Sequence, residues 1–310
     1  MNVSKKDKKV LSRDGAHQLS GVVYVPECDI KGFFHIVHGM TEYIGRYDKF
    51  MRELAAEGYI CFGYDHLGHG NTANGDSELG YIAKKDGWEL LCRDVAVFSE
   101  AVISEYSGAS PLPYYLMGHS MGSFIVRLAA EKRFVTPDKL IVMGTGGPNP
   151  AADAGLALIA LTKLFKGEKH HSKLIDNIAF GSYDSRFSDS TPECPKAWLT
   201  NDTSVRKKYM LDKFCTFGFT VSAMGDLIRL IKYSNGKKWY KDFPDGLPVL
   251  LISGNDDPVG NFGKGVETVA ERLKKQGKDV SCILYEGARH EILNDFTYEQ
   301  VKNDILGFIN

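Results

Sequence analysis

The chain has 310 residues, 43% of them hydrophobic, and its formal net charge is −1 at pH 7. A chain of this size can bury a large core, and its balanced charge excludes the basic excess that marks nucleic-acid-binding proteins. The six cysteines are dispersed without a CxxC pair, and the lysine-rich residues 1–9 are not followed by the apolar segment of a signal peptide. We therefore expect reduced thiols and a cytoplasmic location.

Predicted strands and helices alternate along most of the chain. Residues 13–15 form a turn between two antiparallel strands at 10–11 and 19–25. From Trp88 to Val102, apolar residues recur at steps of three and four, which predicts a helix that Asp86 and Glu89 begin with the spacing of a capping box. The remaining predicted strands are residues 32–37, 59–64, 114–117, 139–144, 249–253 and 280–285, and the remaining helices are 47–56, 123–133, 266–273 and 301–308.

This alternation has a consequence for where ligands bind. Strands alternating with helices predict an α/β fold with a mostly parallel sheet and helices on both of its faces. Ligands of such sheets bind beyond the carboxyl ends of the strands. The polar loops of this chain follow strands, and we expect them to meet at that edge.

Residues 148–239 interrupt the alternation. A bare loop of this length is improbable in a compact domain, so we expect an inserted helical cap (lid) over a core made of residues 1–147 and 240–310. The most apolar part of the insertion, residues 151–165, contains Asp153 and Lys163 and is too short and too interrupted to cross a bilayer.

Gly118-His119-Ser120-Met121-Gly122 is the motif on which the functional prediction depends. It lies between a predicted strand and a predicted helix, which is the setting of a nucleophile elbow, where flanking glycines permit a sharp turn that exposes a serine hydroxyl. A serine hydroxyl needs a neighbouring base, usually an imidazole oriented by a carboxylate. Ser120 is therefore the candidate nucleophile.

The loops after the last two predicted strands supply a base and an acid. His290 follows the last strand and is the best placed of the nine histidines to act as the base. Asp256 and Asp257 both follow the preceding strand, and successive residues of an extended chain point to opposite sides. We choose Asp257, because the residue before Pro258 is held extended, and Asp256 stays the alternative.

An oxyanion formed by attack on an ester carbonyl needs fixed donors. The backbone N–H groups of Met121, after the nucleophile, and Met40, after the third predicted strand, are in place for this role. This chemistry needs no metal or organic cofactor. Asp65, His66 and His69 are too sparse for a metal site, and a loop braced by hydrogen bonds is the better interpretation.

Five motifs occur in order along the chain: His38-Gly39-Met40-Thr41-Glu42 with Arg46-Tyr47, Asp65-His66-Leu67-Gly68-His69-Gly70, Gly118-His119-Ser120-Met121-Gly122, Gly254-Asn255-Asp256-Asp257-Pro258-Val259 and Gly287-Ala288-Arg289-His290-Glu291. Together they resemble those of the α/β-hydrolases of the monoacylglycerol lipase and lysophospholipase group. The resemblance covers residues 11–147 and 247–310, and it implies an eight-stranded, mostly parallel α/β-hydrolase sheet with an inserted cap. It also implies Ser120 as nucleophile, His290 as base, Asp257 as acid, and the Met40 and Met121 amides as oxyanion donors.

The cap of this group shapes an acyl-chain pocket. We therefore assign Leu158, Leu161 and Phe217 of the cap, with Gly39 and His119 of the core, to the substrate pocket. Apolar residues at helical spacing are also explained by packing of the cap on the core, and transient contact with a membrane surface is a third interpretation.

We predict a serine hydrolase that cleaves carboxylic esters, with monoacylglycerols or lysophospholipids as the leading small-molecule substrates. A short-chain carboxylesterase, a thioesterase and an aminopeptidase-like hydrolase stay open, because the three residues fix acyl transfer and not the leaving group. A scaffold that binds an acyl ligand without turnover is the alternative from another class.

Overall fold

The computed structural model describes residues 2–108 and 110–310, and within them eight strands form one sheet in the order β1-β2-β4-β3-β5-β6-β7-β8. The strands are β1 (Val3–Leu11), β2 (Gln18–Pro26), β3 (Gly32–Val37), β4 (Tyr59–Tyr64), β5 (Tyr114–His119), β6 (Lys139–Met143), β7 (Val249–Gly254) and β8 (Val280–Tyr285). β1 and β2 pair antiparallel with their neighbours, and the other pairs are parallel. The prediction of a mostly parallel eight-stranded sheet is confirmed.

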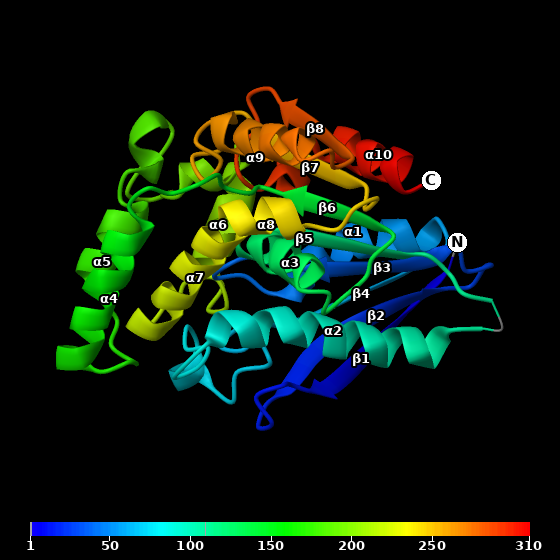
Figure 1. Ribbon diagram of the computed structural model, residues 1–310, viewed down its shortest axis with the longest axis horizontal. Coiled ribbons are helices and arrows are strands. Elements are labelled where there is room, and N and C mark those ends of the chain that lie inside the picture. The colour runs from blue at the N-terminus through cyan, green and yellow to red at the C-terminus, as the bar shows by residue number, and fades with distance from the viewer. Residues whose placement is uncertain (1, 109) are drawn as a thin grey trace.

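Helices cover both faces of the sheet (Figure 1). α1 (Asp48–Ala56) and α10 (Tyr298–Ile309) pack on one face, and α2 (Gly87–Tyr106), α3 (Met121–Glu131) and α9 (Lys264–Lys275) pack on the other. The strand side chains alternate between these two cores, since successive residues of a strand point to opposite faces. All six residues of β3, β4, β5 and β7 are buried, as expected of strands covered on both sides.

Two local predictions need correction. β1 begins at Val3, not at residue 10, because its lysine-rich half forms an exposed edge strand whose charges hide the apolar alternation. Asp86 does not cap α2: it has φ 52°, in the left-handed region, and its side chain accepts no cap hydrogen bond. Glu89 instead forms an ion pair with Arg93 one turn later in the helix.

The chain between β6 and β7 is mainly helical. It contains α4 (Ala152–Lys166), α5 (Lys173–Phe180), α6 (Thr203–Leu211), α7 (Val221–Ser234) and α8 (Lys237–Asp242). α7 packs on α3 of the core and on α4, and both α4 and α5 appear at the left of Figure 1, away from the sheet. The division of the chain at residues 148 and 239 stays a prediction.

Five short 3-10 helices complete the secondary structure of residues 2–108 and 110–310: η1 (Ile44–Tyr47), η2 (Asp76–Glu78), η3 (Tyr183–Arg186), η4 (Ala197–Leu199) and η5 (Ile292–Asn294). η3 and η4 belong to the segment between β6 and β7 and contribute to the site described below. None of the helices in these residues combines the length and the apolar character that crossing a membrane requires.

Candidate active site

Ser120 occupies a sharp turn between β5 and α3. Its backbone has φ 52° and ψ −118°, a conformation that costs energy for a residue with a side chain. The turn is possible because Gly122 passes close to β3: a Cβ atom there would lie 2.0 Å from the carbonyl oxygen of Val37. The Ser120 N–H donates to the Met143 carbonyl at the end of β6 over 2.9 Å, which anchors the turn to the sheet.

Asp257, and not Asp256, lies against the ring of His290. His290 follows β8 and Asp257 follows β7, and 2.8 Å separates His290 Nδ1 from Asp257 Oδ2. Asp257 is fully buried, and its other oxygen, Oδ1, accepts the N–H of Val259 over 2.8 Å. Asp256 instead borders a separate surface hollow with Arg186. The proline-based argument thus selected the aspartate that contacts the imidazole.

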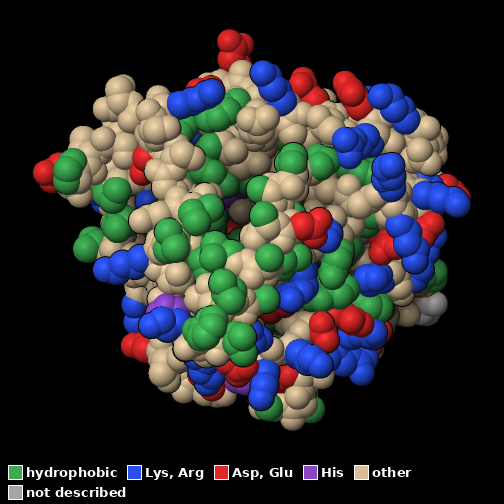
Figure 2. Space-filling model, turned by 60° about the vertical axis from the view of Figure 1, so that its left-hand side comes forward, with side chains coloured by type: hydrophobic (Ala, Val, Ile, Leu, Met, Phe, Trp, Pro, Cys, Tyr) green, Lys and Arg blue, Asp and Glu red, His purple; other side chains and the backbone are tan. Residues whose placement is uncertain are grey.

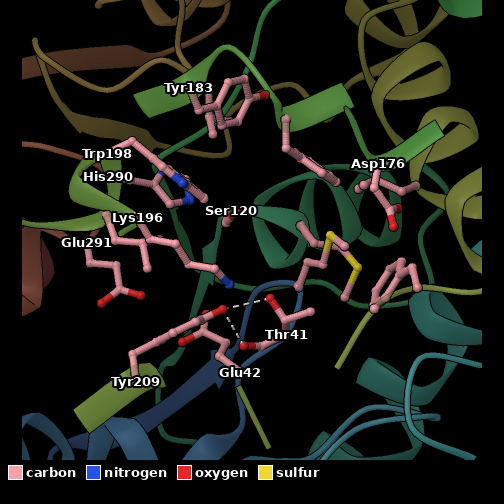
Figure 3. Close-up of a pocket in the computed structure, with 18 of the residues that line it drawn as sticks. Thr41, Glu42, Ser120, Asp176, Tyr183, Lys196, Trp198, Tyr209, His290 and Glu291 are labelled. Atoms are coloured by element: carbon pink, nitrogen blue, oxygen red, sulfur yellow. Dashed lines mark hydrogen bonds between the residues drawn. The ribbon is translucent and has the colours of Figure 1, made fainter. Parts of the chain in front are cut away.

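Ser120 and His290 line the same cavity, and Figure 3 shows both facing its interior. Among the described residues no hydrogen bond joins the Ser120 hydroxyl to the His290 ring. With Asp257 beside Nδ1, the other ring nitrogen, Nε2, has no hydrogen-bond partner among the described residues and can accept the proton of a hydroxyl. Such an arrangement can remove a proton from a hydroxyl and return it to a leaving group.

Met40 and Met121 also border the cavity. Neither backbone N–H donates a hydrogen bond within the described part of the chain. Met121 is the first residue of α3, where helix N–H groups have no intrahelical acceptor and carry partial positive charge. Both amides can therefore donate to a developing oxyanion.

A buried polar network lies beneath this site. Glu42 Oε1 accepts from His119 Nδ1 over 2.9 Å and from the Tyr47 hydroxyl over 3.0 Å. Arg46 donates to both oxygens of Glu291 over 2.6 and 2.7 Å and to Glu42 over 3.1 Å. Arg46 thus joins the loop after β3 to the loop that carries His290.

His119 is adjacent to Ser120 in the sequence and approaches His290 through space. The two imidazole ring centroids are 4.8 Å apart, and His119 Nε2 is 3.3 Å from the His290 carbonyl oxygen. Burial disfavours the charged ring, but the Glu42 carboxylate, together with the Glu291 charge and the His290 carbonyl, raises the pKa of His119. Burial on its own would raise the pKa of Glu42, but His119 and Arg46 lower it below its ordinary value.

The loop after β4 is braced as expected. Asp65 accepts the N–H groups of Ile44 and Asn71, over 2.9 and 2.8 Å. His66 Nε2 lies 3.1 Å from the His38 carbonyl, and burial lowers the pKa of His69 to about 3. Within residues 2–108 and 110–310 no group of three or more His, Cys, Asp or Glu residues has the arrangement of a metal site.

The cavity has a volume of about 420 Å³ and differs in character on the two sides of Ser120. Figure 3 shows Thr41, Glu42, Lys196, Tyr209 and Glu291 on one side of the serine and Asp176 on the other. Aromatic residues surround the Asp176 side: Phe180 lies one turn along α5, and Phe217 and Phe219 flank Gly218, whose Cβ position is 4.0 Å from Asp176 Oδ2.

Two of the five predicted pocket residues line the cavity, His119 and Phe217. Leu158 packs on the core instead, and Leu161 is 56% exposed. α4 is apolar on most of its surface, so its periodicity did not identify the face that points inward. Gly39 lies behind the lining, where its N–H donates to the Glu42 carboxylate.

Several lining residues have no counterpart in the predicted pocket. Tyr183 belongs to η3, Trp198 to η4 and Tyr209 to α6, and Lys196 directly precedes η4, all in the segment between β6 and β7. Their neighbours in the sequence are polar and irregular, so no periodic pattern marks them. Arg46 and Glu291 stand in the motifs quoted above, but pairing of the two motifs is visible only in three dimensions.

Comparison with known proteins gives the family. The family model described as serine aminopeptidase, S33, matches residues 29–297. A monoglyceride lipase homolog of Monkeypox virus is 36% identical over 277 residues, covering 89% of this chain and 87% of the viral protein. The monoglyceride lipase of Mus musculus is 25% identical over 283 residues, covering 90% of this chain and 81% of the mouse protein.

Solved structures of an esterase and a monoglyceride lipase have a fold similar to that of this chain. A thermostable carboxyl esterase from Bacillus coagulans in complex with glycerol has a TM-score of 0.91 at 27% identity, covering 99% of this chain and 98% of the esterase. A monoglyceride lipase from Saccharomyces cerevisiae has a TM-score of 0.75 at 20% identity, covering 95% and 92% of the two chains, which shows the shared fold. The chain therefore belongs to the serine aminopeptidase S33 family of α/β-hydrolases and resembles the monoglyceride lipases within it.

Proposed function

We propose that this protein hydrolyses carboxylic esters of lipids, with monoacylglycerols or lysophospholipids as substrates, through an acyl-enzyme intermediate on Ser120. The comparisons support a small-molecule ester as the class of substrate. The observation that carries the proposal is the meeting of Ser120 and His290 at one cavity, with Asp257 Oδ2 2.8 Å from His290 Nδ1.

The reaction follows from these positions. His290 takes the proton of Ser120 as the serine oxygen attacks the acyl carbonyl, and Asp257 stabilises the imidazolium that forms. The amides of Met40 and Met121 donate to the oxyanion of the tetrahedral intermediate. His290 then protonates the departing alcohol, and water attacks the acyl-enzyme by the reverse sequence, releasing the fatty acid.

The lining of the cavity supports a lipid substrate. Phe180, Phe217 and Phe219, on the Asp176 side, offer an acyl chain an apolar surface. The other side of Ser120 is polar, which suits the alcohol portion of the ester. A short-chain carboxylesterase is the second candidate, because the Bacillus coagulans carboxyl esterase has nearly the same fold over 99% of this chain.

Incubation with a fluorophosphonate probe tests the chemistry. We expect the probe to label the wild-type chain on Ser120 and to label neither Ser120→Ala nor His290→Ala at a comparable rate. A binding scaffold without turnover would leave Ser120 unlabelled. Hydrolysis of p-nitrophenyl esters of increasing chain length, beside glycerol and lysophospholipid esters, tests the substrate: activity confined to acetyl and butyryl esters would support the short-chain candidate and contradict the lipid proposal.

Contact with a membrane surface is part of this proposal. Apolar side chains are exposed on α4 and α5, and Figure 2, which brings the cap forward, shows hydrophobic side chains gathered on this face. Such a patch can enter the headgroup region of a bilayer and collect lipid. The exposed residues are Leu161, Leu164, Phe165, Leu174 and Ile178.

A vesicle sedimentation assay tests this contact. Leu164→Ser with Phe165→Ser removes two side chains that are 77% and 74% exposed, and we expect weaker binding to phosphatidylcholine vesicles with unchanged hydrolysis of a soluble ester. Phe296→Ser, at a 67% exposed position just before the C-terminal helix α10, is the matched control. Equal vesicle binding by the wild type, the double variant and Phe296→Ser would contradict the membrane contact.

A cytoplasmic location completes the proposal. The six cysteines all lie in the described part of the chain and all are free thiols. Free thiols are maintained in reducing compartments. A fluorescent fusion found outside the cytoplasm of the native host cell would contradict this location.

A further inference from the structure

Lys196 occupies an unusual place in the cavity. It is the lysine that lines the cavity, and no arginine of the described residues does so. Its backbone has φ 61° and ψ 39°, the left-handed conformation that is uncommon for a residue with a side chain. Figure 3 shows its side chain directed into the space between Ser120 and the hydrogen-bonded pair of Thr41 and Tyr209.

The cap holds Lys196 in this conformation and ties it to the loop of His290. The Asp184 carboxylate accepts the backbone N–H groups of Lys196 and Trp198, over 2.8 and 3.1 Å. The Trp198 carbonyl in turn accepts the His290 N–H over 3.3 Å, and the Trp198 ring lies 5.2 Å from the His290 ring. The backbone of Lys196 is therefore held in place relative to the loop that carries His290.

The Lys196 ammonium has no anionic partner among the described residues. Its Nζ forms no hydrogen bond or ion pair there, and lies 4.5 Å from the centroid of the Tyr209 ring. The carboxylates nearby are engaged elsewhere: Glu42 with His119 and Arg46, and Glu291 with Arg46.

Burial of this kind is costly for a cation. Burial lowers the pKa of Lys196, although the charges of Glu291 and Asp184 oppose that effect. Lys196 is half-buried, and its charge is only partly compensated because the nearby carboxylates are paired with Arg46 and His119; an anionic ligand would complete the compensation. Lys196 thus offers a positive charge to an anionic ligand on the polar side of the cavity.

We propose that the Lys196 ammonium binds an anionic oxygen, of a phosphate or a carboxylate, on the alcohol portion of the ester. The inference rests on the proposed function, because it places the acyl chain among the aromatic residues and the alcohol portion on the Lys196 side of Ser120. An acylglycerol carrying a phosphate is then a better substrate than the corresponding neutral acylglycerol.

Binding to the full-length Ser120→Ala protein tests this inference without turnover. Calorimetry with octanoylglycerol 3-phosphate and octanoylglycerol should give roughly 10-fold to 100-fold tighter binding of the phosphate, the effect expected of a charge-assisted hydrogen bond. In the Ser120→Ala protein, the further substitution Lys196→Met should abolish the preference for the phosphate ester, whereas Lys196→Arg should retain it. Lys207→Met, at an exposed position of α6, makes the same change of charge outside the cavity and should retain it too.

Two results would overturn the inference: equal affinity of the Ser120→Ala protein for the two esters, or weaker binding of both esters by the same factor after Lys196→Met. The second result would show that Lys196 only maintains the shape of the cavity. An octanoyl ester of lactate distinguishes a carboxylate from a phosphate. If this ester also binds more tightly than octanoylglycerol, the site recognises negative charge in general. If only the phosphate ester binds more tightly than octanoylglycerol, the site recognises phosphate.

The kinetic ratio completes the test in the active enzyme. The ratio of kcat/KM for the phosphate ester to that for the neutral ester should exceed 1 and should fall roughly 10-fold or more in Lys196→Met. Hydrolysis of both esters at equal kcat/KM would overturn the inference and leave the proposed function standing. Tight, charge-dependent binding without hydrolysis would overturn the proposed function and leave the recognition by Lys196 standing.

Discussion

Replacing Asp257 by Asn should nearly abolish hydrolysis while leaving the fold intact. Oδ2 of the buried carboxylate faces His290 Nδ1 at 2.8 Å and accepts the Ser253 hydroxyl at 3.2 Å, and Oδ1 accepts the Val259 N–H at 2.8 Å. Each oxygen therefore faces a donor. An asparagine amide has one oxygen and one donor group, so it cannot satisfy both sides.

Both orientations of the asparagine harm catalysis. If its oxygen keeps the Val259 N–H, its NH₂ group faces His290 Nδ1, which must then accept, so that the ring proton moves to Nε2 and the ring can no longer take the serine proton. If the amide flips, its NH₂ group opposes the Val259 N–H. The loss of the correct tautomer and of the charge predicts a fall in kcat of about 10⁴-fold, or about 5 kcal/mol of transition-state stabilisation.

Steady-state hydrolysis of a p-nitrophenyl ester measures this effect, and Asp256→Asn is the matched control. Asp256 precedes Asp257 but borders the surface hollow outside the cavity, so its variant should keep kcat within about 3-fold of wild type, a free-energy change of under 1 kcal/mol. Thermal unfolding by circular dichroism should show that both variants fold. A loss of activity in Asp256→Asn with an active Asp257→Asn would refute the assignment of the acid.

Two stability predictions follow from buried charge. Arg46→Met leaves the buried Glu291 carboxylate without its cation and leaves Glu42 with His119 alone, so the free energy of unfolding in guanidinium should fall by about 3–5 kcal/mol, whereas Arg52→Met, at a surface pair, should change it little. Burial lowers the pKa of His35 to about 3 in the folded protein. As the pH falls below about 6.5, His35 is protonated in the unfolded chain but not in the folded one, so its contribution to the free energy of unfolding decreases by about 1.4 kcal/mol per pH unit. His35→Phe should remove that share of the slope between pH 6.5 and 5 in urea titrations; identical slopes, or an Arg46→Met protein as stable as wild type, would contradict the respective argument.

The sequence predicted the parts of the site that local chemistry determines. The glycines around Ser120 permit a tight turn between a strand and a helix, so the elbow could be recognised from five residues and the elements on either side of them. Asp257 and His290 follow the last two strands of a parallel sheet, whose carboxyl ends must share one edge. Topology therefore predicted that their two loops would meet, and Pro258 selected Asp257 over Asp256.

The parts that sequence reasoning missed depend on tertiary contacts. Trp198 and Lys196 stand in an irregular segment, and their place beside His290 results from the hydrogen bonds of Asp184 and of the Trp198 carbonyl. The inward face of α4 could not be chosen, because Leu161 and Ile159 are both apolar and only Ile159 is buried. Pairing of Arg46 with Glu291 joins residues 245 positions apart, and no local pattern reports it.

The acyl-enzyme itself tests the central claim most directly. Rapid acid quenching during hydrolysis of a p-nitrophenyl octanoate solution, followed by proteolysis and tandem mass spectrometry, locates the octanoyl group. We predict an octanoyl adduct on Ser120, formed in the initial burst and approaching one per protein molecule. Steady hydrolysis with no adduct on Ser120, or an adduct on another residue that turns over at the rate of hydrolysis, would contradict the account.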